Sequence, residues 1–210
     1  MIQTKITAII FDLGGVLLNL DFNKTFDLFE KMGIPDFPGY FHQSHSNPLF
    51  AQLEKGEIKP AAFYNAFREA TDITTTNADI ETAWNAMLLD FRLESIKYLQ
   101  SLQGQYRLFL LSNTNQIHLE AFRMTYHQTF GNHGFDDHFE KAWYSHELGH
   151  RKPHPSCYAH VLKLGGLHAA ETLFIDDTLK NIEGAKAVGL QTLWLENGQF
   201  IEKVLPGVLA

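Results

Sequence analysis

Short apolar runs alternate with amphipathic stretches along most of the chain, beginning with the run at residues 6–11. That run is rich in β-branched residues and is followed by Asp12 and, after one leucine, two glycines, so it predicts a buried strand over residues 4–11 that ends in a tight turn. Later runs predict strands over residues 107–111, 142–144, 173–175 and 191–195. Apolar residues at helical spacing predict helices over residues 93–102, 116–126, 155–164 and 178–188.

The stretch between the first two predicted strands has a different pattern. Phenylalanines recur at helical spacing over residues 22–32, and amphipathic patterns follow over residues 61–70 and 80–89. No segment between residues 35 and 90 has the pattern of a strand. We therefore expect a small helical domain over residues 18–90, inserted after the first strand.

Strands that alternate with helices are typical of βαβ units, in which right-handed crossovers bring the carboxyl ends of the strands to one edge of a parallel sheet. The predicted fold is therefore α/β, with a doubly wound, Rossmann-like parallel sheet formed by residues 1–17 and 91–210. In such sheets ligands bind outside the carboxyl ends of the strands. Residues that directly follow a strand are accordingly the first candidates for chemistry.

Composition and charge narrow the classes of function. The chain has 210 residues, of which 45% are hydrophobic and 20% charged, as in an ordinary folded protein. The net charge of -7, without a cluster of Lys or Arg, argues against a nucleic acid or an anionic membrane as partner. The single cysteine, Cys157, excludes an intrachain disulfide and favours a reducing compartment. We expect a packed thiol at Cys157 and a cytoplasmic monomer or homodimer.

Polar residues follow the predicted strands where ligands would bind, and a lysine precedes the helix predicted over residues 155–164. These residues are Asp12, Ser112, Asn113, Lys152, Asp176 and Asp177. If the sheet is parallel, three carboxylates, a hydroxyl–amide turn and a lysine share one edge.

Three carboxylates at one edge repel one another, and either protonation or a bound cation relieves the repulsion. Oxygen ligands favour a hard divalent cation, and Mg²⁺ suits one or two carboxylates, some waters and a substrate phosphate. Lys152 adds a positive charge, so the site has the sign that accepts a phosphate dianion. Ser112 and the N–H groups at the start of the following helix can donate hydrogen bonds to phosphate oxygens.

Four segments of the chain resemble, in order, the four motifs of the haloacid dehalogenase superfamily, whose members are mostly phosphohydrolases. They read Phe-Asp-Leu-Gly-Gly-Val over residues 11–16, Leu-Ser-Asn-Thr-Asn over 111–115, Arg-Lys-Pro over 151–153 and Phe-Ile-Asp-Asp over 174–177. The resemblance implies that the helical insertion is the family's cap. Segments over residues 54–58 and 84–88 are similar to the subgroup that contains α-D-glucose-1-phosphate phosphatase.

The resemblance implies a nucleophile and a set of metal ligands. Asp12 would attack the phosphorus and form an aspartyl-phosphate, which water then hydrolyses. Asp12, Asp177 and the backbone carbonyl of Gly14 would bind Mg²⁺, with Asp176 supporting the ion from the side or through water.

The remaining motif residues are implied to act on the phosphate. Ser112 and Asn113 would hold it. Lys152 would stabilise charge on the phosphoryl group and on Asp12, as expected for phosphoryl transfer. The expected substrate is a small phosphorylated metabolite such as a sugar phosphate.

The sequence departs from the family's pattern at Gly14. Most phosphatases of the family carry a second aspartate two residues after the nucleophile, which protonates the leaving group and later activates water, and such a role typically contributes 10²–10⁴-fold. Either the leaving group is intrinsically good, or water or a side chain such as Asp21 replaces the missing acid. The glucose-1-phosphate phosphatase subgroup also has glycine at this position, which favours the first alternative.

Two other functions stay open at the level of sequence. The same Asp12 could displace the halide of a 2-haloacid, but that chemistry needs no metal, so the pair of aspartates at residues 176–177 argues against it. Gly14 also suits a weakly catalytic protein that binds phosphosugars or has a regulatory role.

Overall fold

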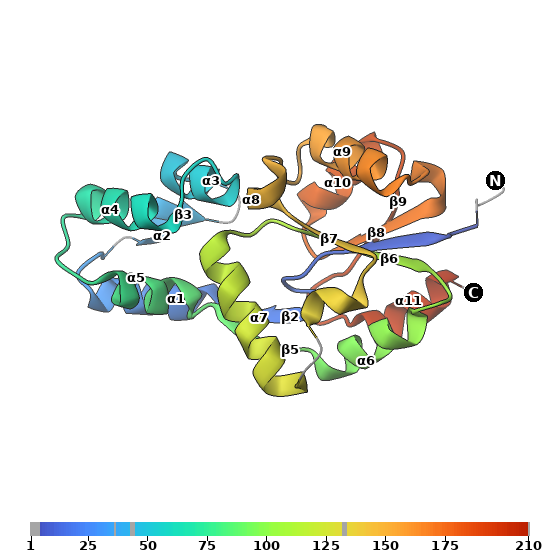
Figure 1. The fold of residues 1–210 in the computed structure, drawn as a ribbon, viewed down its shortest axis with the longest axis horizontal. Coiled ribbons are helices and arrows are strands. Elements are labelled where there is room, and N and C mark those ends of the chain that lie inside the picture. Colours follow the sequence, from blue (N-terminus) through green and yellow to red (C-terminus); the bar gives the residue numbers. More distant parts are fainter. Residues whose placement is uncertain (1–4, 36, 43–44, 132–133, 210) are drawn as a thin grey trace.

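The computed structural model of the chain describes residues 5–35, 37–42, 45–131 and 134–209. A five-stranded sheet of order β7-β6-β1-β8-β9 lies at its centre (Figure 1). The strands are β1 (Ala8–Phe11), β6 (Arg107–Ser112), β7 (Lys141–Tyr144), β8 (Thr172–Asp176) and β9 (Gln191–Trp194). Every neighbouring pair in this sheet is parallel, which confirms the predicted fold class.

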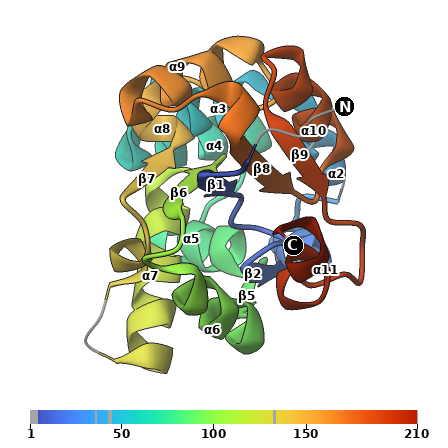
Figure 2. The same ribbon diagram turned by 90° about the vertical axis from the view of Figure 1, so that its right-hand side faces the viewer.

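Helices cover both faces of the sheet (Figure 2). One face packs against α9 (Pro155–Gly165) and α10 (Leu179–Ala187), and the other against α6 (Leu93–Leu102), α7 (Gln116–Phe130) and α11 (Ile201–Leu209). Because both faces are covered, the central strands β1, β6 and β8 are largely apolar rather than alternating. This explains why β1 is a continuous apolar run in the sequence.

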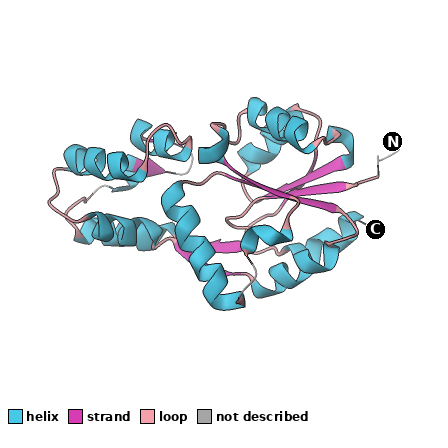
Figure 3. Cartoon of the chain, viewed as in Figure 1, coloured by secondary structure: helices cyan, strands magenta, loops and turns pink. Residues whose placement is uncertain are grey.

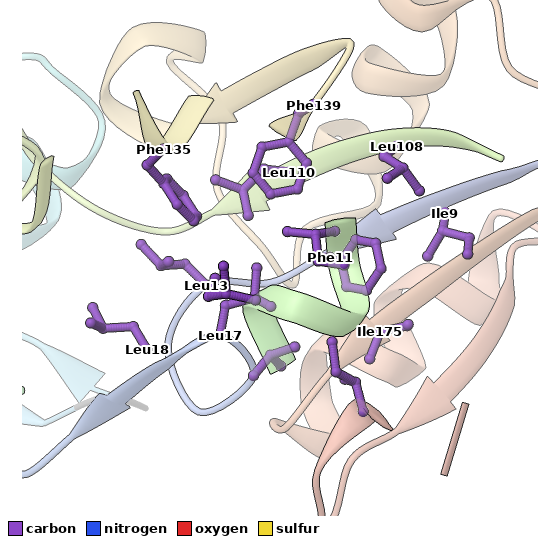
Figure 4. Close-up of a cluster of buried hydrophobic side chains, with 14 of the residues drawn as sticks. Ile9, Phe11, Leu13, Leu17, Leu18, Leu108, Leu110, Phe135, Phe139 and Ile175 are labelled. Carbon is purple, nitrogen blue, oxygen red and sulfur yellow. The ribbon is translucent and has the colours of Figure 1, made fainter. Parts of the chain in front are cut away.

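The pleat of β1 distributes its side chains between two apolar clusters. Ile9 and Phe11 lie with Leu108, Leu110 and Ile175 on the face covered by α6, α7 and α11, as Figure 4 shows. The intervening residues of β1 point to the cluster under α9 and α10. The strand is thereby held from both sides, and its carboxyl end is placed rigidly.

A helical cap lies beside the carboxyl edge of the sheet (Figure 1). It consists of α1 (Phe22–Lys31), α2 (Phe37–Tyr40), α3 (Pro48–Glu54), α4 (Pro60–Thr71) and α5 (Asn77–Asn85), with a short pair of strands, β3 (Phe41–His42) and β4 (His45–Ser46). Its own core is rich in aromatic side chains, among them Phe29, Phe37, Phe50 and Trp84. The stripe of phenylalanines seen in the sequence belongs to this core.

The two ends of the cap segment pair with each other in an antiparallel ribbon. Strand β2 (Leu18–Leu20) pairs with β5 (Leu88–Phe91), and Figure 3 shows this ribbon apart from the main sheet. The predictions of a helix to residue 89 and of no strand between residues 35 and 90 were wrong, because β3 and β4 lie in that range and β5 begins there. A four-residue strand has too few positions to show a period, and its partner lies some seventy residues earlier in the sequence.

Several short elements were not predicted. Helix α3 and helix α11 were absent from the prediction, as were α8 (Ser145–Leu148) and the 3₁₀ turns η1 (Phe135–His138) and η2 (Ala169–Glu171). The start of α3 does carry a local signal, because the Asn47 side chain accepts from Leu49 N–H and Pro48 occupies the first turn. No helix in the described part of the chain is long and apolar enough to cross a membrane.

Candidate active site

Three carboxylates converge at the carboxyl ends of the two central strands. Asp12 directly follows β1, Asp176 is the last residue of β8, and Asp177 follows it. One oxygen of each carboxylate lies within 4.8 Å of the others. These residues are distant in sequence, and the parallel pairing of β1 with β8 brings them together.

Lys152 reaches this cluster from the loop before α9. Its Nζ lies 2.8 Å from Oδ1 of Asp12 and 2.7 Å from Oδ2 of Asp176, and its side chain is 1% exposed. Burial opposes the charged form, but the charges of Asp12 and Asp176 raise the pKa of Lys152 above its usual value, so it stays a cation. One buried cation therefore faces three carboxylates.

The excess of negative charge contributes to raised pKa values of Asp12 and Asp177. Burial and the charge of Asp176 raise the pKa of Asp12 well above its usual value, although Lys152 opposes this shift. Burial and Asp176 also raise the pKa of Asp177. Removing these carboxylates from water therefore favours either protonation or a cation.

The two adjacent aspartates have different surroundings. Asp176 is fully buried and accepts hydrogen bonds from Lys152 Nζ, from Thr178 N–H at 2.8 Å and from Asn181 Nδ2 at 3.0 and 3.1 Å. Asp177 is half-buried, and among the other described residues the Thr178 hydroxyl alone donates a hydrogen bond to its carboxylate, at 3.2 Å. Asp177 thus has the carboxylate that is freer to bind a ligand.

The turn after β6 meets the Lys152 loop. The side-chain amide of Asn113 donates to the backbone carbonyl of Lys152 and accepts from its N–H, both at 2.9 Å. Asn113 therefore fixes the loop that carries the lysine. Ser112, the last residue of β6, is buried and faces the same cavity as Gly14.

A cavity of about 430 Å³ lies between the sheet edge and the cap. Its polar end includes Asp12, Ser112, Asn113, Lys152, Thr178 and Asn181. Its wall toward the cap includes Leu18, Leu20, Phe22, Phe41, Met87 and Leu88, interrupted by the charged side chains of Glu54 and Arg151. The size suits a small organic molecule, with the charged group at the sheet edge and the remainder against the cap.

A model of the haloacid dehalogenase-like hydrolase family matches residues 6–189, a range that includes every residue of this site. The chain belongs to this family. The prediction of the family from four motifs is confirmed. The similarity to the glucose-1-phosphate phosphatase subgroup stays a prediction.

This haloacid dehalogenase-like hydrolase is similar to two curated relatives over nearly its whole length. It is 30% identical over 195 residues to the D-ribitol-5-phosphate phosphatase of Bacteroides thetaiotaomicron, covering 92% of this chain and 93% of the relative. It is also 30% identical over 195 residues to a sesquiterpene phosphatase of Aspergillus oryzae, covering 91% of each.

A solved structure of the same family matches the fold closely. It is a variant of a haloacid dehalogenase family enzyme of Bacteroides thetaiotaomicron in complex with magnesium and inorganic phosphate. The TM-score is 0.88 at 33% identity, covering 92% of this chain and 95% of that chain.

Some residues of this hydrolase's site were not predicted from sequence. Glu54 of the cap pairs with Arg151 of the core at 2.8 Å, and His118 on α7 contacts the cap at Trp84. The family-like segments over residues 54–58 and 84–88 and the motif over 151–153 contain three of these residues, but no local pattern predicts the pairs, because the partners come from different elements. Asn181 was within reach, since it lies five residues after Asp176, at the start of the next helix.

Two further residues considered in the sequence analysis, Asp21 and Cys157, do not contribute to the site. Asp21, considered as a replacement acid, caps α1 by accepting from Asn23 N–H at 3.1 Å and is absent from the cavity lining. Cys157 is fully buried, and burial raises its pKa to about 11, which confirms the packed thiol.

Proposed function

We propose that this chain is a Mg²⁺-dependent phosphatase that hydrolyses a small phosphorylated metabolite through an aspartyl-phosphate. The observation that carries the proposal is the convergence of Asp12, Asp176 and Asp177 within 4.8 Å, beside the buried Lys152. The phosphatase names of its relatives and the magnesium and phosphate bound in a family structure support the same chemistry.

The donor set fits a hard divalent cation. Three carboxylates against one buried lysine leave an excess of about two negative charges, and carboxylate oxygens are preferred ligands of Mg²⁺. Asp12, Asp177 and the carbonyl of Gly14 would hold the ion, and Asp176, occupied by hydrogen bonds, would support it from the side. The bound ion would neutralise the charge that otherwise repels a phosphate dianion.

The geometry at Asp12 suits a nucleophile. Its Oδ1 accepts from Leu13 N–H at 2.7 Å and lies 2.8 Å from Lys152 Nζ. Its Oδ2 has no hydrogen bond within the described residues. One oxygen is thus held in place while the carboxylate still offers a second one, which is the preorganisation that in-line attack on phosphorus requires.

The phosphate itself would be bound by groups at the polar end of the cavity. Ser112 supplies a hydroxyl, and backbone N–H groups before α7 supply further donors. Asn113 contributes mainly by fixing the loop of Lys152, whose cation would stabilise charge on the phosphoryl oxygens.

The substrate class we propose is a sugar or polyol phosphate. The cavity volume suits such a molecule, and one relative is named for a polyol phosphate. We also propose that residues 18–90 form a cap that opens and closes about the β2–β5 ribbon, because this ribbon contains both connections of the cap to the core.

Phosphate release from a metabolite panel tests this function. We expect release that needs Mg²⁺, and we expect Asp12→Asn to lower kcat by roughly a thousandfold or more, because an amide cannot form the aspartyl-phosphate. Asp27→Asn, on the exposed side of α1, is the matched control and should retain full activity.

Three results would contradict the proposal. Full activity of Asp12→Asn or full activity in a chelator would exclude the mechanism. Metal-independent chloride release from a 2-haloacid would favour the dehalogenase. Tight binding of phosphosugars without turnover would favour the regulatory alternative.

A further inference from the structure

The proposed phosphatase reaction, on which this inference rests, needs a proton donor. An alkoxide that leaves a sugar or polyol phosphate is a strong base, so a positioned acid typically contributes 10²–10⁴-fold. Gly14 has no side chain to serve, and Asp21 is a helix cap outside the cavity. The acid must therefore be sought among the other residues that face the cavity.

Most ionisable groups in the cavity lining are engaged or unsuitable. Burial lowers the pKa of His118 to about 4, and its Nε2 lies 3.2 Å from the Trp84 carbonyl, so at neutral pH it is uncharged and its proton is held by that carbonyl. His154 is exposed, and its Nδ1 accepts from Ser156 N–H at the start of α9. Lys180 is exposed on α10, and the Arg151 guanidinium does not deprotonate.

Glu54 is the carboxyl that remains. Apart from Asp12, it is the one carboxyl group that lines the cavity within the described residues. It is the last residue of α3 and is 9% exposed, so it is largely removed from water. Burial raises its pKa while Arg151 opposes the shift. A carboxyl group in such surroundings can carry a proton closer to neutral pH than an exposed one.

Contacts with the core hold Glu54 in place. Its Oε2 lies 2.8 Å from the Arg151 guanidinium, and Arg151 directly precedes Lys152. Two residues after Glu54, Gly56 packs so closely on α8 that a Cβ there would lie 2.0 Å from the carbonyl oxygen of His146. Glu54 thus belongs to the cap, but its carboxyl group is positioned by Arg151 of the core. Arg151 lies in the same loop as Lys152.

We propose that Glu54 acts as the general acid and base, in place of the aspartate that most phosphatases of the family carry at the position of Gly14. As Asp12 forms its bond to phosphorus and the bond to the leaving oxygen breaks, the Glu54 carboxyl group gives its proton to that oxygen and an alcohol leaves. The Glu54 carboxylate then takes a proton from water while the water oxygen attacks phosphorus. The bond between phosphorus and Asp12 breaks, phosphate leaves, and both residues return to their starting states.

Glu54→Gln tests this assignment with two substrates whose leaving groups differ. An alkyl phosphate such as ribitol 5-phosphate needs protonation, whereas p-nitrophenyl phosphate releases a stable anion without it. With p-nitrophenyl phosphate we expect a burst of about one p-nitrophenolate per active site followed by slow turnover, because only the second step still needs a base. With the alkyl phosphate we expect a kcat at least roughly a hundredfold lower and no burst.

Controls separate this role from a structural one. Glu57→Gln changes an exposed glutamate on the same segment, which pairs with Lys55, and should leave both activities unchanged. Should Glu54→Gln fold poorly, Glu54→Ala supplies a second test, in which added formate should restore turnover of the alkyl phosphate by occupying the vacated space.

The outcomes are distinct. An unchanged kcat in Glu54→Gln, an equal loss on both substrates without a burst, or a change in KM alone would overturn the role of Glu54 while leaving the phosphatase function intact. Failure of formate to restore Glu54→Ala would also count against it. A wild-type chain that releases phosphate from neither ester would overturn the proposed function itself.

Discussion

At the scale of single residues, the site depends on how closely backbone segments approach. Gly15 has a φ of +72°, and a Cβ there would lie 2.0 Å from Oδ2 of Asp177. Only glycine allows both the left-handed conformation and this approach. The glycines after Asp12 are therefore part of the site, in addition to ending the strand.

Gly15→Ala is expected to weaken Mg²⁺ binding by roughly 10–100-fold, because the methyl group displaces the carboxylate of Asp177. Metal titration by calorimetry, or phosphate release against Mg²⁺ concentration, measures the change. Gly104→Ala is the matched control, since Gly104 has a similar φ of +77° and no heavy atom within 4 Å of the added Cβ. Equal metal affinities in the two variants would contradict the expectation.

At the scale of elements, the cap and the core meet through a buried histidine. His118 on α7 stacks on Trp84 of α5 with ring centroids 4.7 Å apart, and its Nε2 lies 3.2 Å from the Trp84 carbonyl. Because the ring is buried, its pKa falls from 6.5 to about 4. Docking of the cap on α7 therefore favours the uncharged imidazole.

This lowered pKa predicts a loss of stability in acid. The unfolded chain binds a proton at His118 below pH 6.5, whereas the folded chain binds it only near pH 4, so stability is fully present above pH 6.5 and is lost as the pH falls toward 4. The loss approaches about 3 kcal/mol. Urea unfolding between pH 7 and 4 should show this component in the wild type and not in His118→Gln, and parallel curves for the two would contradict it.

At the scale of the whole molecule, the ligand site lies between two parts of the chain. The cavity is lined by residues of the cap and of the core, and the two parts have separate apolar clusters. A ligand in this cavity contacts both parts. The cavity exists only in the folded chain, so the ligand does not bind the unfolded chain. Binding should therefore raise the stability of the molecule as a unit.

We expect Mg²⁺ and inorganic phosphate together to raise the Tm more than either does alone. At a ligand concentration of about 100 Kd the gain is about 2.7 kcal/mol, which corresponds to roughly 5–10 °C in a chain of this size. Thermal unfolding followed by circular dichroism measures the shift, with potassium chloride of equal ionic strength as the control. A shift that the salt alone reproduces would exclude a specific site.

The sequence by itself determined the parallel sheet and the residues at its edge. Asp12, Lys152 and Asp177 could be identified because the signals are local: a buried strand is an apolar run, and the residue that follows it has a known place in a parallel sheet. The sequence is sufficient to place a residue when two things are known: the strand that the residue follows, and the rule that parallel strands end at one edge of the sheet.

Only the tertiary structure decided how the cap meets the core. The β2–β5 ribbon, the pair of Glu54 with Arg151 and the contact of His118 with Trp84 each join segments far apart in the chain. Residues 54–58, 84–88 and 151–153 resemble family segments, but none of these patterns specifies the contact, because each side chain is selected by a partner that the neighbouring residues do not encode. Residues that make these contacts line the cavity, among them Leu18, Leu88, Glu54, Arg151 and His118.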